Sequence, residues 1–137
     1  MSIKSLELKE HPEFLLHVSP LKNLGSIMEN GLMAQIGKSS FEHDEEAVWL
    51  CELDEKHLDY LLSWLMKDHI GEDLIALKID TKLAPYITST GLVYEYYTEK
   101  NIPPEGISVY KQIASNYKPI VTQEFLDEFA PPFINKE

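Results

Sequence analysis

One acidic residue, Glu95, stands inside a run of aromatic residues that is typical of a short β-strand. Tyr94 and Tyr96 flank it, and a Pro-Pro turn and a second strand follow within residues 93–109. Placing a carboxylate in a half-buried strand costs free energy unless the group is paired. Two interpretations follow: Glu95 faces solvent on an edge strand, as most glutamates do, or another group pairs with it and its presence has a functional reason.

A second candidate is His17, which lies near the end of an apolar run at 13–19. Ser19 and Pro20 follow it and match the N-cap and the first residue of a helix. At such a strand end, an imidazole and the N–H groups of a helix N-terminus can meet one ligand. The alternative is a half-buried histidine that hydrogen-bonds the backbone.

Motifs of several other chemistries are missing from the sequence. It contains no phosphate-binding P-loop, no GxGxxG turn, no HExxH zinc motif and no GxSxG nucleophile elbow. The single cysteine, Cys51, lies in an apolar strand and is expected in the core. The run of His43, Asp44, Glu45 and Glu46 has metal-ligating side chains, but such charge runs are usually solvated faces, so no metal site is assigned.

The composition limits the classes of partner. The chain has 137 residues, 12 lysines, no arginine and a formal net charge of −11. This charge repels nucleic-acid backbones, and arginine is the preferred bidentate ligand for phosphate. The single cysteine suits a reducing cytosol, and no apolar run is long enough for a signal peptide or a membrane span. We therefore expect a cytoplasmic protein that binds neither nucleic acid nor membrane.

The hydrophobic periodicity predicts one α+β domain over residues 1–137, with residues 1–12 as a loose lead-in. Strands are predicted at 13–19, at 47–51, at 74–79, around Glu95 and at 106–113. Helices are predicted from Pro20 to a stop at Gly31 and over 55–68, with Asp54 as the N-cap of the second. Residues 32–46 and 86–91 are expected to be loops, and 123–129 a short helix or strand.

Several segments, in this order, resemble the ADP-ribosyltransferase superfamily. The likeness is to its small bacterial and phage members and to the branch with the DNA ADP-ribosyltransferase toxins and RNA 2′-phosphotransferases. The matching segments, within residues 14–113, are His17-Val18-Ser19-Pro20, Asn30-Gly31-Leu32, Ile36-Gly37, Val48-Trp49-Leu50, Glu95-Tyr96-Tyr97 and Ile102-Pro103-Pro104-Glu105-Gly106-Ile107. The resemblance implies a split β-sheet core with a few helices and a reaction that cleaves NAD.

The resemblance implies a catalytic role for Glu95. It matches the family glutamate that hydrogen-bonds the 2′-hydroxyl of the nicotinamide ribose, and Tyr94 beside it is counted among the NAD-binding residues. Breaking the N-glycosidic bond builds positive charge on the ribose. A carboxylate aimed at that ribose therefore stabilises the transition state more than the ground state.

The remaining NAD contacts implied by the resemblance come from three segments. His17 and Ser19 match the residues that bind the adenine-side ribose. Gly37 and Ser39 are expected in the loop that covers NAD. Tyr60 is the nearest match to the aromatic residue that stacks on nicotinamide, which leaves as a neutral group.

These expectations describe an NAD-dependent ADP-ribosyltransferase, or an NAD glycohydrolase, with a protein or small-molecule acceptor. Two features depart from the family pattern: the lack of arginine removes the phosphate grip of the phosphotransferase branch, and the charge of −11 argues against a nucleic-acid acceptor. The alternative is a catalytically inactive module of the same fold that acts as an acidic partner of a basic protein. A third interpretation is an unrelated α+β domain in which His17 and Glu95 are ordinary residues.

Overall fold

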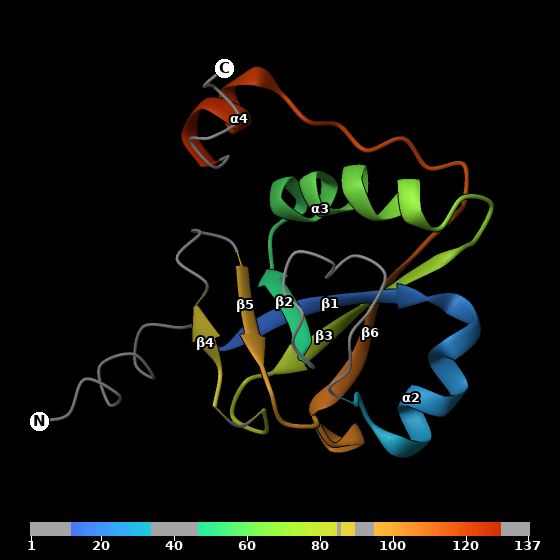
Figure 1. The fold of residues 1–137 in the computed structure, drawn as a ribbon, viewed down its shortest axis with the longest axis vertical. Coiled ribbons are helices and arrows are strands. Elements are labelled where there is room, and N and C mark those ends of the chain that lie inside the picture. Colours follow the sequence, from blue (N-terminus) through green and yellow to red (C-terminus); the bar gives the residue numbers. More distant parts are fainter. Residues whose placement is uncertain (1–11, 34–46, 85, 90–94, 130–137) are drawn as a thin grey trace, which may run out of the picture.

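The computed structural model describes residues 12–33, 47–84, 86–89 and 95–129. Within them the chain forms a six-stranded antiparallel sheet in the order β4-β5-β2-β1-β3-β6 (Figure 1). The strands are β1 (Phe14–Pro20), β2 (Val48–Glu52), β3 (Leu74–Asp80), β4 (Thr88–Ser89), β5 (Glu95–Thr98) and β6 (Ile107–Ile113). The α-helices of this part of the chain are α2 (Leu24–Asn30), α3 (Glu55–Asp68) and α4 (Gln123–Phe129). The α+β class predicted from the sequence is confirmed.

The first face of the sheet, named here the α2 face, carries the larger hydrophobic core. Leu15 of β1, Leu50 of β2 and Leu77 of β3 contribute to it, and Ile27 of α2 packs over them. The three leucines are almost fully buried. Burying a leucine side chain contributes about 1.5–3 kcal/mol, so these contacts fix the position of α2.

The opposite face, named here the α3 face, is covered by the long helix α3 (Figure 1). Leu16 and Cys51 project from the strands on this side, and Leu58 and Leu62 pack against them from the helix. Successive side chains of a strand alternate between faces. The neighbours Leu15 and Leu16 therefore belong to different cores.

Of the two predicted helix N-caps, one is confirmed and the other is wrong. Asp54 caps α3 as predicted, because its carboxylate accepts hydrogen bonds from the backbone N–H of Lys56 at 2.8 Å and of His57 at 3.4 Å. The predicted N-cap at Ser19 is wrong. Strand β1 continues through Pro20, whose ψ of 137° is still extended, and a 3-10 turn at Leu21–Asn23 precedes α2.

The C-terminal part of the described chain packs on the outer side of α3. Residues 123–129 form a helix, α4, which lies beyond α3 as seen from the sheet (Figure 1). Tyr117 donates a hydrogen bond from its hydroxyl to Asp59 at 2.6 Å, and the backbone N–H of Ile120 donates to the same carboxylate at 3.3 Å. The buried carboxylate of Asp59 thus holds the segment that leads into α4.

The segment predicted as a loop at 86–91 contains a short strand. Thr88 and Ser89 form β4, which pairs with Tyr97 and Tyr96 of β5 at one edge of the sheet. Two residues are too few for the period-2 pattern that identifies strands in a sequence.

Within the described residues, none of the helices has the length and apolar character needed to cross a membrane.

Candidate functional site

Strand β1 is paired very differently along its two edges. With β3 it forms seven registered pairs, from Phe14↔Asp80 to Pro20↔Leu74. With β2 it forms two, Leu15↔Glu52 and Leu16↔Cys51. A continued register would pair the next residue, His17, with Leu50, but the ladder stops there. The sheet therefore has a break between β1 and β2 that begins at His17.

His17 replaces a ladder contact at this break. Its Nδ1 lies 2.8 Å from the backbone carbonyl oxygen of Trp49 in β2. A carbonyl only accepts, so Nδ1 carries the proton and donates, and Nε2 of the neutral ring is left as an acceptor. Burial lowers the pKa of His17, and the hydrogen bond to Trp49 offsets part of this shift. The ring is therefore neutral near pH 7.

Two further polar groups lie on the α2 face near the break. Ser19 is buried two residues after His17, on the same side of β1. Glu52, the partner of Leu15, accepts a hydrogen bond from the hydroxyl of Tyr96 at 2.9 Å. Burial, followed by this contact with Glu52, raises the pKa of Tyr96 to about 12. The sequence analysis did not identify this carboxylate, because nothing in the sequence shows that the end of β2 lies beside β1.

Glu95 belongs to a different set of neighbours. It is half-buried in β5 and pairs with Cys51, and Tyr97 two residues on pairs with Trp49. The rings of Trp49 and Tyr97 pack against each other with centroids 5.2 Å apart. Glu95 therefore lies beside an aromatic pair on the α3 face that the sequence analysis did not single out.

Cys51 is a core residue, as the sequence predicted. The thiol is buried, and burial is the largest cause that raises its pKa to about 12. The carboxylates of Glu52, Glu95 and Asp54 contribute smaller parts of the same rise. A thiol with such a pKa is protonated at pH 7, so Cys51 is unsuited to act as a nucleophile.

The structure separates His17 from Glu95. By strand alternation His17 lies on the α2 face, whereas Glu95 shares the α3 face with its partner Cys51. Among the described residues the polar contact of His17 is with Trp49 and not with Glu95. His17 and Glu95 therefore project from opposite faces of the sheet.

The other predicted NAD-binding residues do not join either group. Tyr60 is buried on the outer side of α3, where its ring packs against Phe125 of α4 at 5.3 Å and against Trp64 at 6.2 Å. It is therefore not available to stack on a ligand at the break. Gly37, Ser39 and Tyr94 lie outside the described residues, as does the acidic run at 43–46.

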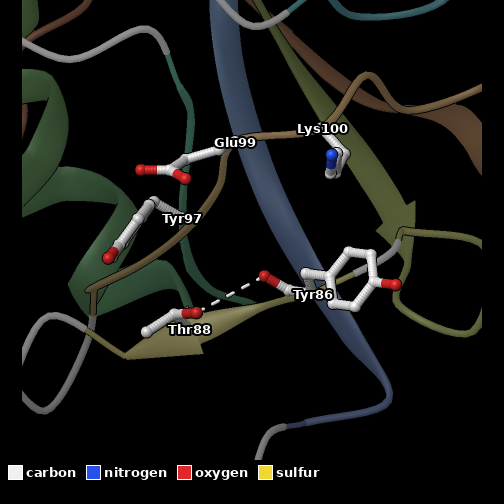
Figure 2. Close-up of a pocket in the computed structure, with 5 residues that line it drawn as sticks. All are labelled: Tyr86, Thr88, Tyr97, Glu99 and Lys100. Atoms are coloured by element: carbon white, nitrogen blue, oxygen red, sulfur yellow. Dashed lines mark hydrogen bonds between the residues drawn. The ribbon is translucent and has the colours of Figure 1, made fainter.

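Metal-ligating side chains do not gather in the described part of the chain: no group of three or more His, Cys, Asp or Glu residues there is placed to hold an ion. A cavity of ≈ 260 Å³ lies at the β4–β5 edge of the sheet and is lined by Tyr86, Thr88, Tyr97, Glu99 and Lys100 (Figure 2). A second cavity of ≈ 270 Å³ in the described part of the chain is lined by Lys56, Thr122, Glu124, Phe125 and Glu128, beside α3 and α4.

Comparisons with known proteins leave the chain without an assigned family. No family model, no curated protein and no solved structure matches it.

Proposed function

We propose that the protein is an NAD-cleaving enzyme, an ADP-ribosyltransferase or NAD glycohydrolase, that binds NAD at the break between β1 and β2. The observation that carries this proposal is the end of the β1–β2 ladder at His17, the first residue of the segments that resemble the ADP-ribosyltransferases. A split sheet is the core that this resemblance implies. At this point a side chain takes the place of the ladder, because the Trp49 carbonyl accepts from the His17 imidazole.

His17 is suited to hold a ribose hydroxyl. Its Nδ1–H is directed to the carbonyl of Trp49 at 2.8 Å, which fixes the tautomer and leaves Nε2 as a hydrogen-bond acceptor. Burial lowers the pKa of the ring, so it remains neutral and able to accept at pH 7. Ser19, on the same face of β1, adds a hydroxyl that both donates and accepts.

Glu95 would act on the nicotinamide ribose from the α3 face. Because His17 and Glu95 project from opposite faces, an NAD molecule bound by both has to span the break between β1 and β2. The rings of Trp49 and Tyr97 flank Glu95 and offer an aromatic surface to the departing nicotinamide, which replaces the role expected for Tyr60. The carboxylate opposes the positive charge of the oxocarbenium-like transition state.

Few cationic side chains are available near His17 to bind the pyrophosphate of NAD. The chain contains no arginine, and Lys22, which is exposed in the turn after β1, is the cation nearest in sequence to His17 among the described residues. Lys38 lies outside them. A single exposed lysine grips phosphate less well than a bidentate arginine, so we expect weak NAD binding.

The test is release of nicotinamide from NAD, with and without cell lysate as a source of acceptor. Glu95→Gln should lower kcat by about 10²–10³-fold, the scale for losing a group that stabilises transition-state charge. His17→Ala should mainly raise KM, because it removes a contact present in both states. Glu105→Gln, at an exposed glutamate in the turn before β6, is the matched control. Equal inertness of the wild type and all variants would remove the enzyme proposal.

The second candidate is an inactive module that binds a basic protein. The observation in its favour is that His17 and Glu95 begin on opposite faces of the sheet, so they need not share a ligand. A net charge of −11 then serves attraction to a basic partner. A pull-down at low salt that recovers no basic protein, together with a melting temperature raised by NAD, would count against this candidate.

A further inference from the structure

The cavity at the edge of the sheet combines aromatic and charged side chains. Tyr86 precedes β4, Thr88 lies in it, Tyr97 lies in β5, and Glu99 and Lys100 follow β5 (Figure 2). Its volume of ≈ 260 Å³ is below the roughly 300–1,000 Å³ of typical small-molecule sites. A space of this size suits one side chain of a partner.

Tyr86 adopts a conformation that costs free energy. Its φ is +59°, the left-handed region, and it is the non-glycine residue with positive φ in the described chain. A bulky residue rarely occupies this region, and such strain concentrates at functional sites. The ring is also 62 % exposed, so burial does not offset the cost. A hydrogen bond from the Thr88 hydroxyl to the Tyr86 carbonyl at 3.4 Å, drawn in Figure 2, supports the turn.

A cation of the chain itself already lies against the aromatic surface of this cavity. The Nζ atom of Lys100 lies over the Tyr86 ring, 6.0 Å from its centroid, so the ring faces a cation supplied by the chain itself. The lysine backbone is fixed, because its N–H donates to Thr98 Oγ1 at 3.1 Å, but its side chain is exposed and can swing away. Glu99, next to it, adds a carboxylate to the same cavity.

The charges of the chain select a cationic rather than an anionic occupant. An anion would meet the Glu99 carboxylate and the field of a chain with net charge −11. A guanidinium or ammonium group can instead lie against the face of the Tyr86 ring, and the carboxylate of Glu99 in the same cavity lining attracts it.

We propose that the cavity lined by Tyr86, Tyr97 and Glu99 binds an arginine or lysine side chain of a basic protein partner, and that Lys100 occupies the aromatic face until the partner displaces it. The proposal shares Tyr97 with the aromatic surface proposed for nicotinamide, but its test uses no NAD and its substitutions are at Tyr86, Glu99 and Lys100, so it can fail while NAD cleavage stands, and the reverse.

The first experiment titrates the whole protein with acetyl-Gly-Arg-Gly-amide and follows backbone and aromatic chemical shifts by NMR. The peptides acetyl-Gly-Gln-Gly-amide and acetyl-Gly-Glu-Gly-amide are the neutral and anionic comparisons. The arginine peptide should shift resonances of Tyr86, Thr88 and Glu99, and the other two should not. Equal shifts with all three peptides, or a response to the glutamate peptide alone, would overturn the proposal.

Two substitutions at the Tyr86 ring and its internal cation should act in opposite directions. Tyr86→Asn should weaken arginine-peptide binding by about two- to fivefold, the size of an exposed cation–π contact. Lys100→Met should strengthen binding, because it removes the internal competitor. Lys67→Met is the matched control, since Lys67 lies over the Trp64 ring at 5.5 Å on α3, away from the cavity. If Lys100→Met and Lys67→Met change the affinity equally, only net charge matters and the cavity proposal fails.

A stability measurement separates binding from folding. Asparagine tolerates the left-handed region better than tyrosine, so Tyr86→Asn should keep or raise the melting temperature while it weakens binding. Glu99→Gln should also weaken binding, whereas Glu29→Gln, at an exposed glutamate of α2, should not. A Tyr86→Asn variant that melts at the wild-type temperature and binds the arginine peptide with wild-type affinity would contradict the proposal.

Discussion

The two edges of strand β1 show how one strand can serve both the fold and a candidate site. Along β3 it is paired over its whole length, and Leu77, the partner of His17, is completely buried. Along β2 the ladder ends after two pairs, and a single imidazole contact to Trp49 bridges the gap. The fully paired β3 edge contributes stability through apolar burial, whereas along the β2 edge a side-chain hydrogen bond takes the place of further ladder pairs, and this is where we propose that NAD binds.

The largest loss of stability should come from a substitution where β1 and β3 are fully paired. Leu77→Ala removes a fully buried side chain from the core on the α2 face. It should lower the free energy of unfolding by about 2–5 kcal/mol, measured by urea denaturation. Val109→Ala on the adjacent β6, where the side chain is 51 % exposed, should change it by about 0.5 kcal/mol or less. A Leu77→Ala variant as stable as the Val109→Ala variant would mean that β1 and β3 are not closely packed.

Binding of NAD at the break between β1 and β2 should stabilise the folded protein. At an NAD concentration about 100 times its Kd, the free energy of unfolding should rise by about 2.7 kcal/mol. His17→Ala should reduce this gain at the same NAD concentration, and Lys67→Met, on the outer side of α3, should not. Thermal denaturation with and without NAD measures the difference. A gain that is unchanged in His17→Ala would place NAD away from the break.

Removing the bridging imidazole should affect stability less than opening the core. His17→Ala leaves the Trp49 carbonyl without its donor, which should cost about 1–3 kcal/mol if water does not replace the ring. Urea denaturation beside Leu77→Ala gives the comparison. A loss larger than that of Leu77→Ala would show that the His17 side of β1 is core and not a binding edge.

The smallest expected effect is on the pH dependence of folding. Burial lowers the pKa of His17 below its ordinary value of 6.5, so the unfolded chain binds more protons between the lowered pKa and 6.5. Stability should therefore fall as the pH drops below about 6.5, by at most about 1.4 kcal/mol per pH unit for one proton. His17→Gln lacks this loss, so its unfolding free energy should decrease less than that of the wild type between pH 7 and 5.5. Parallel pH profiles would mean that His17 is solvated.

The elements of the fold were predictable from local patterns, whereas their pairing was not. Helix α3 follows from its apolar spacing and from Asp54, and the strands around Leu15, Leu50 and Leu77 follow from their apolar runs. The face of the sheet on which His17 or Glu95 lies depends on the register of its strand. A shift of one residue moves every side chain of that strand to the opposite face. The sequence does not contain that information locally, so the break at His17 could not be located in advance.

The position of Tyr60 was misjudged for a related reason. Its helical spacing identified it correctly as part of α3, but the residue that covers it, Phe125, comes from α4, more than 60 residues later. The prediction for residues 123–129 left helix and strand open, so it could not reveal this contact. Trp49 and Tyr97 become neighbours only when β2 pairs with β5.

The most direct test of the account is a crystal structure of the Glu95→Gln variant with NAD. The account predicts that NAD lies between the unpaired parts of β1 and β2, with a ribose hydroxyl on His17 Nε2 and the nicotinamide ribose at position 95. A structure in which β1 and β2 pair beyond Leu16↔Cys51, or in which NAD at saturating concentration binds elsewhere or not at all, would contradict it.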